Sequence, residues 1–257
     1  MDSSDLKDYT ETPDLDFKWL KQAANGNDAL LSKYIARRQK GEPVAKIIGQ
    51  KGFWTLDLKV SKDTLDPRPD SETIIDAVLK NFPDKSAPLR ILDLGTGSGC
   101  LLLALLDEYK NATGVGMDAS AAALQIAQQN VKKYALTRTK LICRSWHDDN
   151  WWDDLGGFDV VVCNPPYIPT DEIQNLDIDV KNYDPLEALD GGQDGLQDYR
   201  ALSDTIAQVL KQNGLIFFEI GKGQEDDVTA IMQAKKLRFQ KSYRDLGNIT
   251  RVLVFSI

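Results

Sequence analysis

Residues 158–167 combine an apolar segment with side chains that are able to bind an amino group. Residues 158–163 are apolar apart from Asp159, which predicts a strand buried on both faces of a parallel sheet. Pro165 and Pro166 end this strand, so Asn164 follows its carboxyl end, the edge at which open α/β sheets bind ligands. The Asn164 side-chain oxygen and the Pro165 carbonyl can accept the two hydrogens of a planar NH2 group, while Tyr167 packs on its face.

This arrangement is suited to the transfer of a group onto nitrogen. An NH2 group conjugated to a carbonyl or an aromatic ring is a poor nucleophile, so holding it in line with an electrophile supplies most of the available catalysis. Accepting its hydrogens stabilises the charge that develops on nitrogen during attack, and no general base is required. An Asn-Pro-Pro-Tyr sequence also fits a strand that ends in a rigid loop and binds no ligand. Other parts of the sequence are needed to choose between a binding site and such a loop.

A second candidate site is the glycine-rich loop at residues 93–99. Gly95, Gly97 and Gly99 alternate with Thr96 and Ser98 between a predicted strand and a predicted helix. Such glycines let the backbone turn tightly and approach a ligand, and the following helix amino terminus supplies free N–H groups. A dinucleotide loop has the spacing G-x-G-x-x-G. The G-x-G-x-G spacing found here, preceded by an aspartate, fits a ligand that carries an amino acid and a nucleoside but no pyrophosphate.

Two further residues follow neighbouring predicted strands. Asp118 closes the second strand, in the position where a carboxylate receives two ribose hydroxyls. Its alternative role is a helix cap shared with Ser120. Trp146 comes just after the third strand, where an aromatic ring could flank an adenine or contact a sulfonium, or pack at the rim without a ligand.

The elements that must position these residues alternate between strands and helices. This alternation predicts βαβ units and a doubly wound, mostly parallel sheet. The predicted strands cover residues 90–94, 113–117, 140–143, 158–163, 215–220, 250–257 and, more weakly, 239–243, and the predicted helices cover residues 100–109, 120–134, 196–212 and 228–234.

The first third of the chain has a different pattern. Apolar residues recur at helical spacing around residues 17–24 and 30–35, and residues 25–27 break the pattern. Residues 54–60 then alternate as a half-buried strand or hairpin arm, and a helix capped by Asp70 or Ser71 follows. We therefore expect a small helical domain with a hairpin linker at residues 1–62 and a cofactor-binding domain at residues 63–257.

Composition limits the possible partners and compartments. A chain of 257 residues with a net charge of -8 argues against duplex DNA or a membrane surface as a partner. Cys100, Cys143 and Cys163 lack CxxC spacing and are expected to be buried thiols, and His147, the only histidine, is expected to lie in a loop, so no metal site is predicted. Residues 1–12 are polar without a signal pattern, and no apolar run reaches transmembrane length, so a cytoplasmic protein is expected.

The Asp-Leu-Gly-Thr-Gly-Ser-Gly loop, the acidic residue after the second strand and Asn-Pro-Pro-Tyr together resemble class I S-adenosylmethionine-dependent N-methyltransferases. From about residue 37 onward the chain is similar to the peptide chain release factor glutamine methyltransferases. This resemblance rests on Gly41-Glu42-Pro43, Gly49, Leu65, Pro67-Arg68-Pro69-Asp70-Ser71-Glu72, Tyr183-Asp184-Pro185, Ala188-Leu189, Gly192, Asp194-Gly195-Leu196, Tyr199-Arg200, Glu219-Ile220-Gly221, Asp245-Leu246-Gly247 and Arg251.

The resemblance implies a Rossmann-like, seven-stranded fold and methyl transfer from S-adenosylmethionine to the side-chain amide nitrogen of the glutamine in a release factor's Gly-Gly-Gln loop. It implies that the small N-terminal domain helps to hold the release factor and that residues 168–195 form an insertion over the active site. The cofactor would contact Gly95, Thr96, Gly97, Ser98, Gly99, Asp118, Trp146 and Asn164, and the glutamine would contact Asn164, Pro165, Pro166 and Tyr167.

Three alternatives to this function remain open. Methyltransferases that act on the exocyclic amine of adenine also carry Asn-Pro-Pro-Tyr, but the acidic charge and the lack of an evident basic DNA-binding region disfavour them. A Rossmann dehydrogenase is disfavoured by the glycine spacing. A non-catalytic protein that binds the translation machinery would need neither the cofactor residues nor Asn164. A monomer that does not bind DNA is expected.

Overall fold

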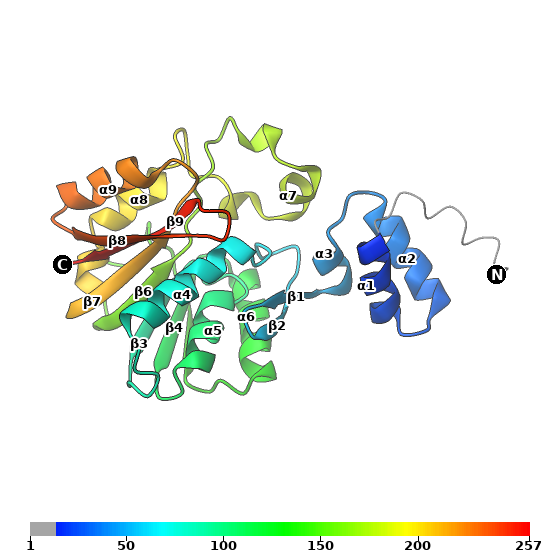
Figure 1. Ribbon diagram of the computed structural model, residues 1–257, viewed down its shortest axis with the longest axis horizontal. Coiled ribbons are helices and arrows are strands. Elements are labelled where there is room, and N and C mark those ends of the chain that lie inside the picture. Colours follow the sequence, from blue (N-terminus) through cyan, green and yellow to red (C-terminus); the bar gives the residue numbers. More distant parts are fainter. Residues whose placement is uncertain (1–13) are drawn as a thin grey trace.

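The strands predicted from residue 90 onward form one seven-stranded sheet in the computed structural model (Figure 1). The structure describes residues 14–257, so the expectations for residues 1–12 lie outside the described residues. Strands follow the order β5-β4-β3-β6-β7-β9-β8, and only β9 runs antiparallel to its neighbours. Their bounds are β3 Arg90–Leu94, β4 Thr113–Asp118, β5 Thr139–Cys143, β6 Phe158–Cys163, β7 Leu210–Glu219, β8 Arg238–Arg244 and β9 Thr250–Ser256.

Helices cover both faces of this sheet (Figure 1). On one face, α4 (Glu72–Asn81), α5 (Cys100–Glu108) and α6 (Ala121–Lys133) contribute to a core with Val162 and Phe217. On the other face, α8 (Gln197–Ser203) and α9 (Glu225–Ala234) contribute to a core with Cys163 and Phe218. Successive residues of a strand point to opposite faces, so residues 160–163 of β6 and the residues 215–218 of β7 that pair with them are all apolar. The doubly wound fold is confirmed.

A small helical module precedes the sheet. It contains α1 (Asp14–Ala24), α2 (Asp28–Arg38) and α3 (Val44–Ile48), which pack around a separate core that includes Leu20 and Ile35. The sequence predicted α1 and α2 but missed α3, because five residues are too few to show helical periodicity. Pro43 precedes α3 and Gly49 ends it with a φ of 71°, the left-handed conformation that glycine adopts without strain.

A hairpin of β1 (Gln50–Phe53) and β2 (Leu56–Lys59) leads from this module to the sheet. The predicted alternation is observed in β2, where Leu56 and Leu58 are buried and the residues between them are exposed. Phe53, Leu56 and Leu58 join the core under α4 and α5, so the hairpin packs against the larger unit. The division of the chain into residues 1–62 and 63–257 stays a prediction.

Three expectations were wrong. The helix expected at residues 196–212 ends at Ser203, and a 3-10 turn (Ile206–Val209) leads directly into β7, because an apolar spacing of three to four residues fits both a helix and a helix followed by a turn. Neither Asp70 nor Ser71 caps α4 with its side chain; both lie in a 3-10 turn (Pro69–Ser71) ahead of that helix. Of the three thiols expected to be buried, Cys163 is buried, Cys100 is half-buried, and Cys143, on the edge strand β5, is exposed.

Candidate active site

The glycine loop after β3 turns sharply beneath the end of β4. Gly95, Gly97 and Gly99 have φ values of 72°, 55° and 85°, which favour glycine. The Gly97 N–H donates to Asp118 Oδ2 over 2.8 Å, and the Ser120 N–H donates to the other oxygen of Asp118 over 2.8 Å. Asp118 therefore holds the loop as well as the start of α6, where Ser120 is the side-chain cap.

A cavity of about 640 Å3 opens above this loop, within the size range of small-molecule sites. A Cβ atom at Gly95 would lie 3.2 Å from the Trp146 ring, so glycine is needed for the ring to approach the backbone. Burial raises the pKa of Asp118, while hydrogen bonds from the Ser120 and Gly97 amides lower it. Among the residues expected to bind the cofactor, those that line the cavity are Gly95, Gly97, Asp118, Trp146 and Asn164.

Thr96, Ser98 and Gly99 do not line this cavity. The Thr96 hydroxyl donates to the buried Asp93 carboxylate over 2.6 Å. Burial raises the pKa of Asp93 to about 7, and its hydrogen bond from Thr96 opposes this shift. Ser98 is buried, and a Cβ atom at Gly99 would lie 3.2 Å from Leu103. The structure places these three residues where they shape the loop and the start of α5.

The Trp146 side chain is held by a residue that sequence reasoning missed. Asp198 is buried in α8, and its Oδ1 accepts a hydrogen bond from Trp146 Nε1 over 2.8 Å. The same oxygen lies 2.7 Å from Nε2 of His147, which is in a loop as predicted but also lines the cavity. The only feature of the sequence that could have indicated Asp198 was its acidic side chain between Leu196 and Tyr199, two buried residues of a predicted helix.

A second cavity of about 250 Å3 lies on the other side of Asn164. Asn164 lines both cavities, and its Nδ2 donates to Ser71 Oγ over 3.3 Å. That bond fixes the amide orientation, and no residue within 14–257 donates a hydrogen bond to Asn164 Oδ1. The smaller cavity is lined by Leu65, Arg68, Pro69, Asp70, Asn164, Tyr167, Ile168, Val180, Ala188, Leu189 and Glu219.

Of the other residues in the Asn-Pro-Pro-Tyr sequence, one lines each cavity and one lines neither. Tyr167 lines the smaller one, where its hydroxyl donates to Glu219 Oε1 over 3.4 Å and burial raises its pKa. Pro166 lines the larger one, and Pro165 is buried and lines neither. The segment expected to cover the site, residues 168–195, contains α7 (Ile178–Tyr183) and contributes Ala188 to both walls.

Comparison with known proteins identifies the family. A family model described as a methyltransferase domain matches residues 85–243. The release factor glutamine methyltransferase of Agrobacterium fabrum is 43% identical over 231 residues, which cover 88% of this chain and 78% of the relative. The chain belongs to the release factor glutamine methyltransferase family. Another member, from Caulobacter vibrioides, is 46% identical over 229 residues, covering 88% of this chain and 77% of the relative.

Solved structures show the same fold in more distant methyltransferases. A methyltransferase from Pyrococcus furiosus is 15% identical, with a TM-score of 0.56 over 88% of this chain and 98% of that chain. This likeness confirms the class I methyltransferase fold. No helix within residues 14–257 is long and apolar enough to cross a membrane.

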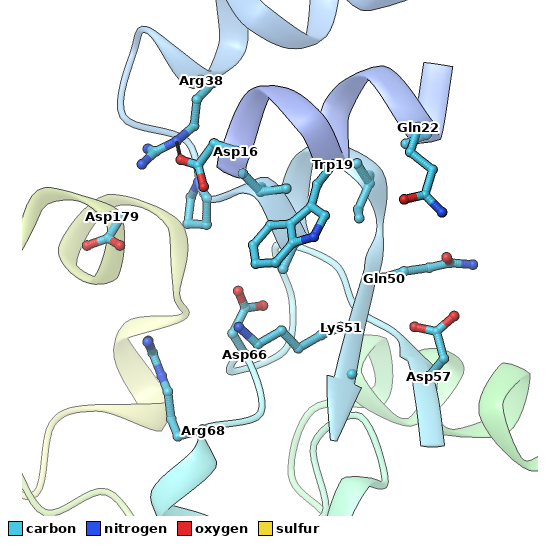
Figure 2. A pocket seen from close by; sticks show the side chains of 16 residues that line it. Asp16, Trp19, Gln22, Arg38, Gln50, Lys51, Asp57, Asp66, Arg68 and Asp179 are labelled. Atoms are coloured by element: carbon cyan, nitrogen blue, oxygen red, sulfur yellow. Dashed lines mark hydrogen bonds and ion pairs between the residues drawn. The ribbon is translucent and has the colours of Figure 1, made fainter. Parts of the chain in front are cut away.

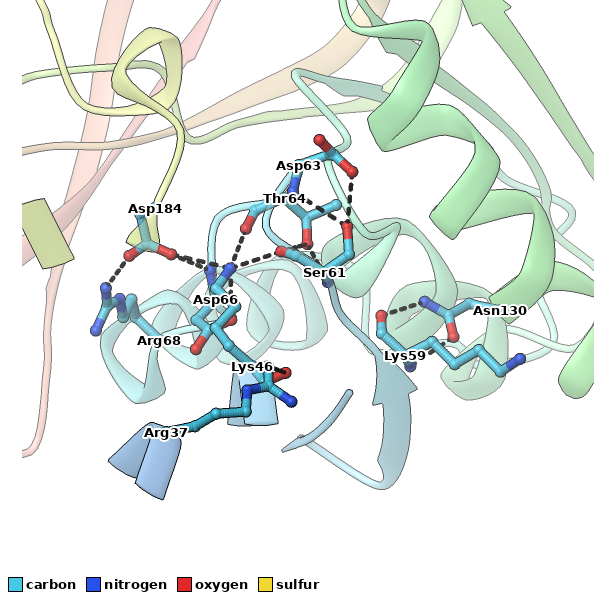
Figure 3. Close-up of polar contacts among 10 residues, drawn as sticks. All are labelled: Arg37, Lys46, Lys59, Ser61, Asp63, Thr64, Asp66, Arg68, Asn130 and Asp184. Atoms are coloured by element: carbon cyan, nitrogen blue, oxygen red, sulfur yellow. Dashed lines mark hydrogen bonds and ion pairs between the residues drawn. The ribbon is translucent and has the colours of Figure 1, made fainter. Parts of the chain in front are cut away.

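Beside the smaller cavity, a buried ion cluster joins three segments of the chain (Figure 3). Lys46 of α3 lies 2.9 Å from Asp66 Oδ1 and 3.1 Å from Asp184 Oδ1, and it also donates to the Ser61 and Thr64 carbonyls. Asp184, which follows α7, is also paired with Arg68. Lys46 thus ties the helical module to the 61–68 segment and to the end of α7.

A third cavity borders this cluster (Figure 2). Its volume is about 780 Å3, and its walls come from α1, the start of α3, the hairpin and Asp66. The Trp19 side chain points into it, as Figure 2 shows. Arg68 lines both this cavity and the smaller cavity beside Asn164. The two cavities therefore border one another at that side chain.

Proposed function

We propose that this chain transfers a methyl group from S-adenosylmethionine to the side-chain amide nitrogen of the glutamine in the Gly-Gly-Gln motif of a peptide chain release factor. One observation carries the proposal: the Asn164 amide lies where two cavities meet, with the glycine loop and Asp118 on one side and Tyr167 on the other. Membership of the release factor glutamine methyltransferase family supports the choice of substrate.

The residues of the larger cavity fit the proposed cofactor. Gly95 presents a backbone without a Cβ atom, Asp118 presents a carboxylate able to accept ribose hydroxyls, and the Trp146 ring forms an aromatic wall. Thr96, Ser98 and Gly99 would act indirectly, by holding the loop in shape. When bound, S-adenosylmethionine supplies a methyl group already activated by the positive sulfur that carries it.

The Asn-Pro-Pro-Tyr segment beside the smaller cavity would bind and align the glutamine. Asn164 Oδ1, whose orientation is set by Ser71, would accept one amide hydrogen, and the Pro165 carbonyl would accept the other. Tyr167 would pack against the plane of the amide, and Pro166 would form the wall towards the cofactor. These contacts raise the rate by alignment and by stabilising positive charge as it develops on nitrogen.

The partner and the location are part of the same proposal. A release factor is a soluble component of translation, so the enzyme would act in the cytoplasm, as a monomer and without binding DNA. The net charge of -8 supports the last point, because an acidic protein is repelled by phosphate groups.

The test is methyl transfer from labelled S-adenosylmethionine to three substrates in parallel: a purified release factor, its Gln→Ala variant in the Gly-Gly-Gln motif, and duplex DNA. We expect label on the wild-type factor alone. Label on DNA would assign the function to adenine methylation, and label on no substrate would favour a non-catalytic binding protein.

A further inference from the structure

Glu219 lies beside Asn164 at the carboxyl edge of the sheet. β6 and β7 are parallel neighbours, and Cys163 pairs with Phe218, so Asn164 and Glu219 follow at adjacent positions. The Cys163 and Phe218 side chains face the core beneath α8 and α9, whereas the Val162 and Phe217 side chains face the core beneath α4, α5 and α6. Asn164 and Glu219 therefore project to the same side of the sheet, towards the turn that precedes α4.

The Glu219 carboxyl group is buried and only partly hydrogen-bonded. Its exposed fraction is 1%, and its Oε1 accepts from the Tyr167 hydroxyl. Its Oε2 is buried and has no hydrogen bond of normal geometry within the described part of the chain, although the Ser71 hydroxyl lies near enough to this carboxyl group to lower its pKa. A buried polar atom without a partner is costly, and Glu219 lines the cavity assigned to the acceptor glutamine. Glu219 therefore places a carboxyl group with one incompletely bonded oxygen at the wall of this cavity.

The groups facing Glu219 let its charge change near neutral pH. Burial raises its pKa to about 7, Ser71 and Arg251 lower it, Asp70 raises it and the Tyr167 hydrogen bond lowers it. Arg251 is shared, because it also lies 2.8 Å from Asp70 and 3.0 Å from Asp245. A carboxyl group with a pKa near the working pH is suited to accept and release a proton.

We propose that Glu219 is a further catalytic residue, whose Oε2 accepts the proton that the amide nitrogen loses on methylation. The role rests on the proposed function. The nitrogen lone pair forms the new bond to the methyl carbon, the carbon–sulfur bond breaks, and its electrons leave on sulfur as a neutral thioether. The N–H bond then breaks, its electrons remain on nitrogen, and the proton forms an O–H bond with Glu219. Product release returns this proton to water.

The ionised Glu219 carboxylate would also stabilise the transition state of methyl transfer, before it accepts the proton. Positive charge develops on the amide nitrogen as the methyl group arrives, and a carboxylate in a cavity shielded from water stabilises that charge. Asn164 supplies a neutral acceptor on the same side of the sheet, and Glu219 supplies the negative charge. Turnover should therefore require Glu219 to be ionised and should rise with pH through its pKa.

The experiment compares the wild-type enzyme with Glu219→Gln, which keeps the size of the side chain but cannot take up a proton. Single-turnover methylation of a release factor is measured from pH 5.5 to pH 9, together with the KM for the factor and calorimetric binding of S-adenosylmethionine. We expect the rate constant of the variant to fall about 100-fold at pH 8 and to lose its rise through neutral pH. Cofactor affinity and KM should change less than about threefold.

Two further variants separate this role from a structural one. Tyr167→Phe removes the hydrogen bond to Oε1 but leaves the carboxyl group, so it should keep the rise of the rate with pH, with the midpoint moved to higher pH because this hydrogen bond lowers the pKa of Glu219. Glu225→Gln makes the same chemical change in α9, in a residue that lines neither cavity, and should match the wild type. Thermal unfolding of Glu219→Gln should be no lower than that of the wild type, because the change removes a buried charge.

Each outcome decides the proposal. If Glu219→Gln methylates the factor at the wild-type rate, or keeps the rise with pH, Glu219 is not the proton acceptor and the proposed function stands. If the rate falls because KM or cofactor affinity fails, Glu219 is a binding residue and the proposal is wrong. If the wild-type enzyme itself transfers no label to the factor, the proposed function fails, and the role of Glu219 fails with it.

Discussion

Replacing Lys46 by Met should strongly destabilise the protein. The side-chain exposed fractions are 3% for Lys46, 7% for Asp66 and 2% for Asp184, so the change removes a buried ammonium and leaves two buried carboxylates. Breaking a buried ion pair costs about 3–5 kcal/mol. Arg68 still pairs with Asp184, and burial already raises the pKa of Asp66, so Asp66 can become protonated. We therefore expect a loss of about 3 kcal/mol, or roughly 6–12 °C in Tm.

The assay is urea unfolding followed by circular dichroism, with Tm measured in parallel. Lys62→Met is the matched control, since Lys62 is 87% exposed and its ion pair with Asp63 should contribute less than about 1 kcal/mol. Adding Asp66→Asn to Lys46→Met removes the carboxylate left without an ion-pair partner and should restore part of the stability, while Asp184 keeps its pair with Arg68. A loss below about 1 kcal/mol for Lys46→Met, equal to that of the control, would refute the reasoning.

Three other predictions concern the active site. Asn164→Ala should lower the single-turnover rate at least about 100-fold while calorimetry finds cofactor affinity within about threefold; joint loss of both would make Asn164 a cofactor ligand. Trp146→Phe, which loses the hydrogen bond to Asp198 and part of the ring that lies against Gly95, should weaken cofactor binding about tenfold in the same calorimetric assay, and Trp146→Ala should weaken it further. Glu219→Gln should be more stable than the wild type by an amount that rises from none below pH 4.5 to about 3 kcal/mol above pH 7, because burial raises the folded-state pKa to about 7 from 4.5. Urea unfolding at several pH values measures this difference, and equal stability at pH 8 would contradict it.

The sequence predicted the parts of the site whose chemistry is local. The apolar run before Asn164 and the two prolines after it fixed both the strand and its end, and β6 has the predicted bounds. The glycine loop could also be predicted from local sequence, because alternating glycines between a strand and a helix are typical of a tight turn that approaches a ligand. Asp118 accepts hydrogen bonds from the loop and from the Ser120 amide at the start of α6, where Ser120 is the side-chain cap, and its binding of ribose stays a prediction.

The residues that the sequence did not predict act through partners far along the chain. Ser71 is 93 residues from Asn164, Asp198 is 52 residues from Trp146, and Glu219 is 52 residues from Tyr167. Each is a polar residue in an ordinary local pattern, and only the pairing of strands and the packing of helices bring it to the site. Lys46 was missed for the same reason, since its helix was too short to be detected.

The ion pair between Arg251 and Asp70 joins the last strand of the sheet to the turn before α4 and can form only late in synthesis. β9 inserts between β7 and β8, and its Arg251 reaches back across the edge of the sheet to the turn before α4. The ribosome has therefore made 180 further residues before the partner of Asp70 exists. Contacts of such long separation form late in folding, so the cofactor loop, Asn164 and Glu219 are all synthesised before the acceptor cavity can close. A nascent chain should bind the cofactor, if at all, before it can bind the glutamine.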